Sequence, residues 1–77
     1  MKIEEQDIVK FENGKEYLVV KILNYNDNRY FYFTAVNKED FPKYIIMKEI
    51  KDQNTFGKLG EEEFKIVRSK FAFDFSD

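Results

Sequence analysis

The stretch from Glu16 to Val36 decides the fold, and it reads EYLVVKIL, then NYNDN, then RYFYFTAV. Two runs rich in β-branched and aromatic residues flank a short polar cluster of Asn and Asp. Such runs are typical of strands, and Asn and Asp are typical of the turn that joins two strands. The stretch therefore predicts a β-hairpin whose two strands lie at the centre of a sheet.

A third strand is predicted on the N-terminal side of this hairpin. Asp7 to Glu12 contains three large apolar residues and is followed at once by Asn13-Gly14. Asn-Gly between two strand-like runs is a strong hairpin signal, because both central residues of a type I′ turn need a positive φ. We therefore expect the run at 7–12 to pair with the strand that begins near Glu16.

Further strands are predicted on the C-terminal side. The segment Asn37 to Lys43 is polar and contains the single proline, whose fixed φ and missing N–H suit a loop. Tyr44 to Ile50 is the next strand-like run. Lys51 to Gly60 carries turn-forming residues, with room for a short extended piece around Phe56.

The pattern changes from strand to helix near Glu61. Three consecutive glutamates suit the positive end of a helix dipole, and an apolar stripe of helical spacing follows them. The stripe consists of Phe64, Val67, Phe71 and Phe75. We predict a C-terminal helix that begins at about Glu61, with Phe64 and Phe71 anchoring it to the core.

A strand is the alternative for the end of the chain. Phe71, Phe73 and Phe75 also alternate with other residues, as the side chains of a strand do. Ile66 and Phe73 would lie opposite the helical stripe, which favours this alternative. The alternative fold is an all-β SH3-like barrel whose last strand contains Phe71 to Phe75.

Side-chain alternation assigns the two long strands an inner and an outer side. We predict that the core consists of Leu18, Val20, Ile22, Phe31 and Phe33. The tyrosines are assigned to the other side, because a buried tyrosine needs a partner for its hydroxyl and a phenylalanine does not. The predicted fold of residues 1–77 is one α+β domain: a twisted antiparallel meander of four or five strands, with barrel-like curling left open, and one C-terminal helix.

Composition excludes several classes of function. The chain has 77 residues, no cysteine, no histidine and a net charge of −2. The usual zinc ligands, the thiolate nucleophile and the usual general base are thus missing, so we expect no enzyme, no cofactor and no metal site. The negative charge disfavours nucleic acid, and no stretch is long enough to cross a bilayer or to act as a secretory signal. We expect a cytoplasmic protein.

The chain resembles a known family at three places. Gly14 to Val20, the aromatic run Tyr30 to Phe33, and Glu61 to Phe64 leading to Phe71 are similar to the small YrzB-like proteins of low-GC Gram-positive bacteria. The resemblance implies a compact β-meander with a terminal helix. It implies no activity and no functional residues, because the family has no established activity, and the chain departs from that family's very acidic character.

The most suggestive candidate site is an aromatic face beside basic residues. We predict a partner-binding surface formed by Tyr17, Val19, Arg29, Tyr30 and Tyr32, because Tyr and Arg are enriched at interface hot spots. The alternative is that Tyr30 and Tyr32 pack under the helix. Two other signals are weaker. The three consecutive glutamates could bind a cation only if they converged, and on a helix they point in different directions. The segment Gly57 to Gly60 matches a nucleic-acid-binding Gly-x-x-Gly loop only in its glycines.

Three hypotheses for function follow. The first is a small, non-catalytic protein-interaction module with a protein partner. The second is an acidic inhibitor of a host nucleic-acid enzyme, encoded by a mobile element of bacterial or phage origin, since spread carboxylates can occupy a phosphate-binding channel. The third is a single-stranded nucleic-acid binder that stacks bases on the strand aromatics.

Overall fold

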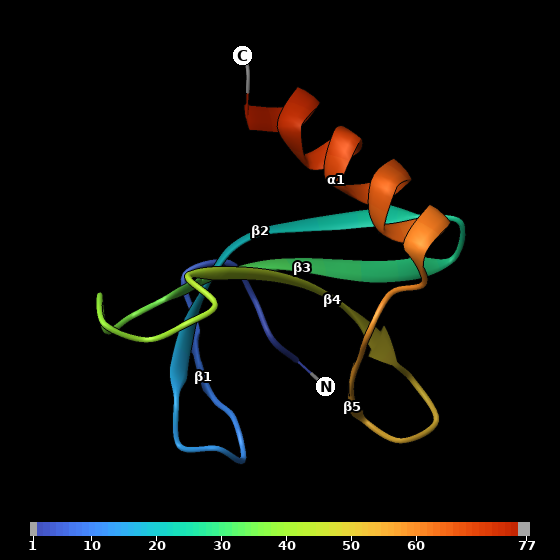
Figure 1. Ribbon diagram of the computed structural model, residues 1–77. Coiled ribbons are helices and arrows are strands. Elements are labelled where there is room, and N and C mark those ends of the chain that lie inside the picture. The colour runs from blue at the N-terminus through green and yellow to red at the C-terminus, as the bar shows by residue number, and fades with distance from the viewer. Residues whose placement is uncertain (1, 76–77) are drawn as a thin grey trace.

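The chain folds into a curled, five-stranded antiparallel sheet followed by one helix (Figure 1). The computed structural model describes residues 2–75 and, of Phe75, only the backbone. The strands lie side by side in chain order, and they are β1 (Ile8–Lys10), β2 (Glu16–Tyr25), β3 (Asn28–Ala35), β4 (Tyr44–Ile50) and β5 (Thr55–Gly57). The helix α1 spans Glu61–Phe75. The predicted α+β meander is confirmed, and the SH3-like alternative is wrong because residues 71–75 are helical.

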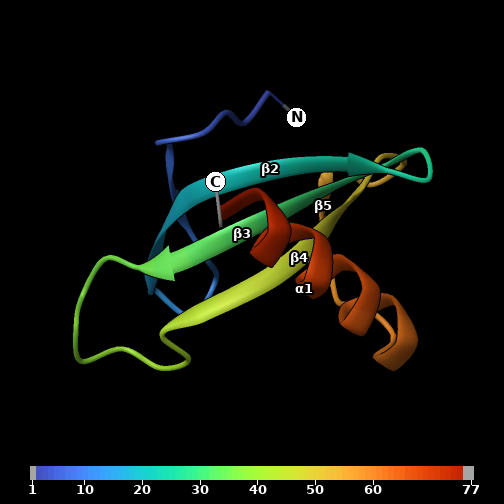
Figure 2. The ribbon, with the colours of Figure 1, turned by 90° about the horizontal axis from the view of Figure 1, so that it is seen from above.

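The sheet curls into half a barrel, and the helix lies outside it. In Figure 1 the ends of the sheet at β1 and β5 curl away from α1. In Figure 2, seen from above, α1 crosses β3 and β4. The sheet therefore has an inner, concave face and an outer face under the helix, and both faces bury side chains. The helix has 15 residues, and no helix among residues 2–75 is long and apolar enough to cross a membrane.

The two hairpins use different turns. Asn26 and Asp27 have φ of 53° and 63°, the type I′ geometry that suits the twist of β2 and β3. In the first hairpin only Gly14 has a positive φ, at 85°, so the type I′ turn predicted at Asn13-Gly14 is wrong. The Gly14 N–H donates to the Phe11 carbonyl at 2.9 Å, which closes a longer loop whose left-handed residue is the glycine. The predicted pairing of the two strands is confirmed.

A β-bulge at Val20 decides which side chains of β2 are buried. The pairing with β3 joins Val19 to Phe33 and Lys21 to Tyr32, and it skips Val20. An extra residue in one strand shifts every later side chain to the opposite side. The core side predicted for β2 is therefore wrong at its start: Val19 is buried, whereas Leu18 and Val20 are half-buried.

The inner core is aromatic. Its fully buried members are Tyr17, Val19, Phe31 and Phe33, and Ile22 packs against them from beyond the bulge. The Phe33 ring lies 5.4 Å from that of Phe11, 5.2 Å from that of Phe56 and 6.0 Å from that of Phe31. The prediction that Phe31 and Phe33 belong to the core is confirmed.

The outer core lies between the sheet and α1. It consists of Tyr30, Ile46, Val67 and Phe71, with exposures between 0% and 8%. The prediction that Phe71 anchors the helix is confirmed. The prediction for Phe64 is wrong, since 36% of it is exposed, and the helix covers the sheet face opposite Phe31, because the residues of β3 alternate between the two cores.

Candidate functional site

The predicted partner-binding residues do not share one exposed face. Tyr17 and Val19 are 2% and 0% exposed and belong to the inner core, whereas Tyr30 is 1% exposed and lies under the helix. Tyr32, Tyr17 and Arg29 border three different surface hollows. The expected contact surface around these tyrosines is thus wrong in its geometry, and the alternative of packing under the helix is confirmed for Tyr30.

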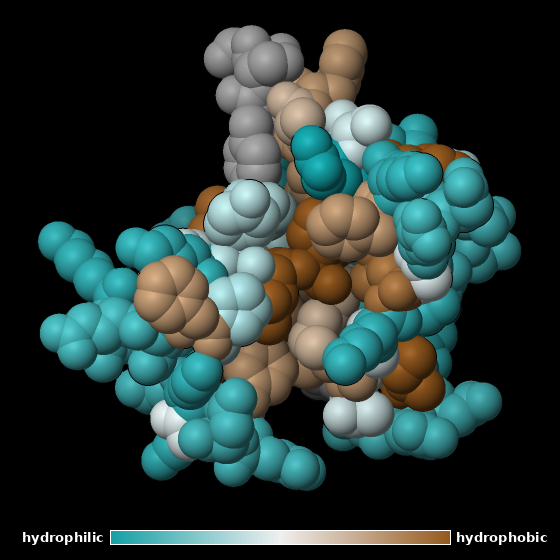
Figure 3. Space-filling view, in the orientation of Figure 1, coloured by the Kyte–Doolittle hydropathy of each residue, from teal (hydrophilic) through white to brown (hydrophobic). Residues whose placement is uncertain are grey.

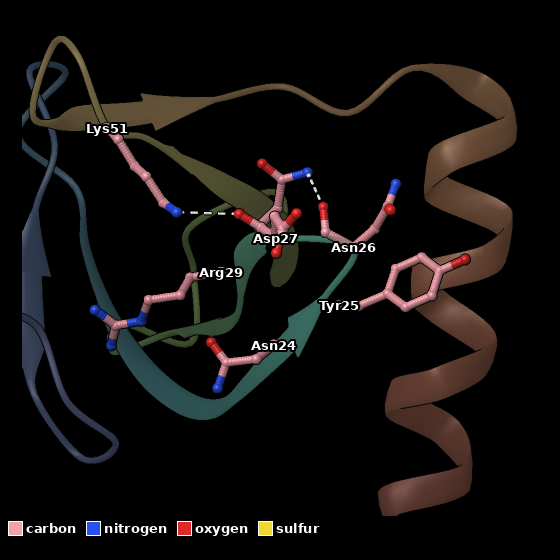
Figure 4. A pocket seen from close by; sticks show the side chains of 7 residues that line it. Asn24, Tyr25, Asn26, Asp27, Arg29 and Lys51 are labelled. Carbon is pink, nitrogen blue, oxygen red and sulfur yellow. Dashed lines mark hydrogen bonds between the residues drawn. The ribbon is translucent and has the colours of Figure 1, made fainter.

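Arg29 is held within the fold. Its Nη2 donates to the Ile3 carbonyl at 2.8 Å, and its guanidinium lies 5.2 Å from the centre of the Phe31 ring. Figure 4 shows the hairpin-tip hollow beside it, where Lys51 reaches toward Asp27 and donates to its carbonyl at 3.1 Å, while Arg29 points away from Asp27. The hollow measures about 420 Å³, and Arg29 and Lys51, the two cations that line it, both already donate hydrogen bonds to backbone oxygens.

Glu63 joins the helix to the sheet. Its Oε2 accepts from the Tyr30 hydroxyl at 2.7 Å and from the Lys48 ammonium at 3.1 Å. Its Oε1 accepts from the Gly60 N–H at 3.2 Å. In this bond the residue at the third position of the helix caps the start of the helix. The carboxylate thus has three donors around it, and its role is to dock α1.

The two partners in this junction have shifted pKa values. Burial and the bond to the Glu63 carboxylate raise the pKa of Tyr30 from 10.0 to about 12. The bond from the Tyr30 hydroxyl, followed by the bonds from Lys48 and Gly60, holds the pKa of Glu63 below its ordinary 4.5 despite its partial burial. At neutral pH the tyrosine therefore donates as a hydroxyl and the glutamate accepts as a carboxylate.

The variant Tyr30→Phe is expected to lose roughly 1.5–3 kcal/mol of stability at pH 7, because a buried bond to a charged acceptor is removed. The Glu63 carboxylate contributes stability above pH 4.5. This contribution is lost as the pH falls through the lower pKa that Glu63 has in the folded state. The Tyr30 contribution exists below 10.0 and is lost as pH rises toward 12. Urea melts of wild type and variant at acidic, neutral and alkaline pH should show a stability difference that is largest in the middle. A difference that does not change with pH would contradict this assignment.

A groove on the outer face lies between α1 and β4. It measures about 270 Å³, and its lining is mostly apolar and aromatic: Tyr32, Tyr44, Ile46, Phe64, Arg68, Phe71 and Ala72. The rings of Tyr32 and Tyr44 stack at 5.9 Å with an angle of 7° between their planes. Figure 3 shows apolar side chains reaching the surface in the middle of this side of the molecule, below the helix. We call this hollow the outer groove.

A larger hollow opens on the concave side of the sheet. It measures about 750 Å³ and is lined by Phe11, Glu12, Asn13, Tyr17, Pro42, Ile45, Met47, Thr55, Phe56 and Lys58. The Tyr17 hydroxyl donates to the Pro42 carbonyl at 2.6 Å, which ties the loop before β4 to the wall of this hollow. We call it the inner groove. The two grooves lie on the two faces of β4, since Tyr44 and Ile46 line one groove and Ile45 and Met47 line the other.

Sequence reasoning missed this pair of grooves. The signal was the run Tyr44 to Met47, which has four large apolar or aromatic residues in a row with no charge. Alternate residues of such a run face opposite sides of the sheet, so a continuous apolar run indicates that both sides have apolar surroundings. The sequence could not show which edge of β4 stays unpaired, because this depends on where β5 ends.

Other candidate sites find no support in the described part of the chain. Residues 2–75 contain no group of three or more side chains that could hold a metal ion, Glu61–Glu63 included. Gly57 ends β5 and Gly60 precedes α1, so this segment joins a strand to a helix, whereas the Gly-x-x-Gly loop of the nucleic-acid-binding fold joins two helices.

The fold and its surfaces define a small α+β half-barrel with apolar grooves on both sides of one strand. Comparison with known proteins found no matching family model, curated protein or solved structure. The resemblance to YrzB-like proteins therefore stays an expectation from the sequence.

Proposed function

We propose that this protein is a non-catalytic protein-interaction module and that its partner binds at the outer groove. One observation carries the proposal: two aromatic side chains, Tyr44 and Phe64, are 61% and 36% exposed on the rim of a groove that also holds Arg68. Single exposed apolar residues are ordinary, but grouped ones mark interaction sites. Tyr and Arg are also the residue types enriched where binding energy concentrates.

The chemistry of the groove supports a protein partner over a substrate. Arg68 is its one charged side chain among the described lining residues, and the chain has no histidine or cysteine to act as base or nucleophile. Nucleic acid is disfavoured for a related reason. Stacking of bases on the aromatics of β3 would need an exposed Tyr30 and an available Arg29. However, Tyr30 is buried, and the Arg29 guanidinium donates to the Ile3 carbonyl.

The test is affinity purification with mass spectrometry from cells that express the chain, comparing Phe64→Asp with Phe73→Asp. Both positions lie on α1 and are exposed, at 36% and 76%, but only Phe64 lines the outer groove. We expect Phe64→Asp to lower recovery of the partner at least about tenfold, since it places a charge in an apolar contact. Phe73→Asp should retain the partner.

Circular dichroism and urea melts of both variants ensure that a loss of binding is not a loss of fold. If every captured protein remains bound to Phe64→Asp, the outer groove is not the contact surface and the proposal fails.

A further inference from the structure

We propose that the partner binds as an added β-strand: an extended segment of another protein pairs with the open edge of β4 at Tyr44–Met47. This inference rests on the proposed function and specifies how the partner binds. The segment would place alternate side chains into the outer and inner grooves. Main-chain hydrogen bonds supply affinity in this mode of recognition, and the pockets for alternate side chains supply specificity.

The backbone of β4 offers free hydrogen-bonding groups along this stretch. The Lys43 carbonyl points toward β3, because it accepts from the Ala35 N–H at 2.7 Å. In an extended strand successive residues direct their N–H and C=O groups to opposite sides, so those of Tyr44 and Ile46 point away from β3. Among residues 2–75, no other strand pairs with β4 before Lys48, where β5 begins to pair through Gly57.

The open stretch exists because β5 is cut short. Three residues of β5 pair with Ile50, Glu49 and Lys48, and the next positions along the same row lie beside Met47 to Tyr44. The chain leaves this row after Gly57, because Leu59 packs into the outer core and the helix begins at Glu61. An incoming segment would continue the row that β5 starts.

This edge lacks the devices that protect exposed strands. Natural edges are guarded by charges, prolines, bulges or covering segments. The far edge of β2 has such a cover: the Gln6 N–H donates to the Val19 carbonyl, and the Ile22 N–H donates to the Glu5 carboxylate at 3.0 Å. The four residues Tyr44 to Met47 contain no charge, no proline and no bulge, so their open edge is suited to being covered by a partner.

The grooves accept side chains from both faces of an added strand. β5 is the last strand of the sheet and covers only the end of β4, from Lys48 to Ile50. Figures 1 and 2 show α1 on one side of β4 and the curled ends of the sheet on the other. The outer groove lies on the helix side, where Tyr44 and Ile46 point, and the inner groove lies on the other side with Ile45 and Met47. The occupant is therefore an extended segment in which apolar residues occupy successive positions on both faces.

The charges around the open edge of β4 indicate which residues flank the apolar part of the partner segment. Lys43 lies at one end of the open edge, Lys58 follows β5 at the other end, and Arg68 lines the outer groove. The inner groove has one carboxylate on its rim, that of Glu12. Complementarity therefore favours acidic residues on both sides of the apolar stretch of the partner.

A second copy of the chain fits this edge poorly. Two-fold pairing of β4 with itself would set Tyr44 opposite Ile46 of the other copy, and Pro42 would then lie beside Lys48 of that copy. That position is already held by Gly57. The β5 of each copy would collide with the loop before β4 of the other, whereas a separate segment has no such flank.

The test is selection of binders from a phage-displayed library of random peptides of about twelve residues, long enough to span the open edge. Selected peptides are measured against wild type, Tyr44→Pro and Tyr44→Val. The proline removes the N–H that points away from β3 and is thus available only to an added strand, whereas valine keeps that N–H and removes the ring. We expect Tyr44→Pro to weaken binding at least about tenfold more than Tyr44→Val. We also expect the peptides to carry acidic residues around an apolar stretch.

A second measurement does not depend on any variant. In wild type, binding of a selected peptide should slow hydrogen exchange of the Ile46 amide at least about tenfold, because that N–H gains a strand partner. If no peptide is enriched, or Ile46 exchange is unchanged, or both Tyr44 variants bind equally, strand addition is overturned. Peptides that lose binding only to Phe64→Asp would overturn strand addition and leave the proposed function standing.

Discussion

Phe71→Ala is expected to leave the protein largely unfolded near room temperature. The side chain is 1% exposed, packs with Tyr30, Ile46 and Val67, and meets the Tyr32 ring edge-on at 5.6 Å. Truncating such a phenylalanine costs about 3–5 kcal/mol, the lost burial plus the cavity left behind. In a chain of only 77 residues, a single hydrophobic core rarely supplies more than about 3–5 kcal/mol of net stability, so this loss is as large as the total. Urea melts followed by circular dichroism would measure the loss.

Phe73→Ala is the matched control for this variant. It removes the same ring from the same helix, two positions later, but its side chain is 76% exposed. The change should therefore alter stability by less than about 1 kcal/mol, as is usual for surface positions. If Phe73→Ala proved the more damaging of the two, the face of α1 that packs on the sheet would be misassigned.

Phe33→Ala is expected to be as damaging on the other side of the sheet. Phe33 is 0% exposed and forms aromatic contacts with Phe11, Tyr17, Phe31 and Phe56. Removing the ring leaves a cavity in the middle of the inner core, at a cost of about 3–5 kcal/mol, and also removes edge-to-face contacts worth about 0.5–1.5 kcal/mol each. The free energy of unfolding from urea melts measures the effect.

Phe33→Leu and Phe41→Ala complete the comparison. Leucine keeps most of the buried volume and loses only the aromatic geometry, so Phe33→Leu should retain more than half of the stability that Phe33→Ala loses. Phe41 is 64% exposed, and Phe41→Ala should be close to neutral. Equal losses for alanine and leucine at Phe33 would show that the ring contacts, not the filled volume, stabilise the inner core.

The strands and the helix could be predicted because their signals are local. Tyr44–Ile50 was predicted with its observed bounds, and the helix begins at Glu61 as predicted. In both cases the pattern of apolar residues and the flanking turn or capping residues lie next to each other in the sequence. The turn at Asn13-Gly14 was predicted in position and was wrong in type, because its φ angles depend on how many residues the loop contains.

The buried faces could not be predicted in full because they depend on contacts between distant residues. The tyrosines were assigned to the side of the sheet away from Phe31 and Phe33, facing outward or toward a cover. This is confirmed for Tyr30, which lies under the helix and bonds Glu63 33 residues away. It is wrong for Tyr17, which belongs to the inner core because its hydroxyl finds the Pro42 carbonyl 25 residues away. The predicted site failed for this reason. The open edge of β4 was equally hidden, because it follows from the place where the chain leaves β5.

The bulge at Val20 shows what the length of β2 contributes beyond its composition. Without Val20, the residues on either side would still meet their present neighbours on β3, so strand pairing does not require it. A bulge bends its strand and increases the local twist. In Figure 1 β2 bends between its β1-paired start and the part beneath the helix. Val20 therefore contributes to the shape of the sheet more than to its pairing, because the bulge sets the local curvature of β2.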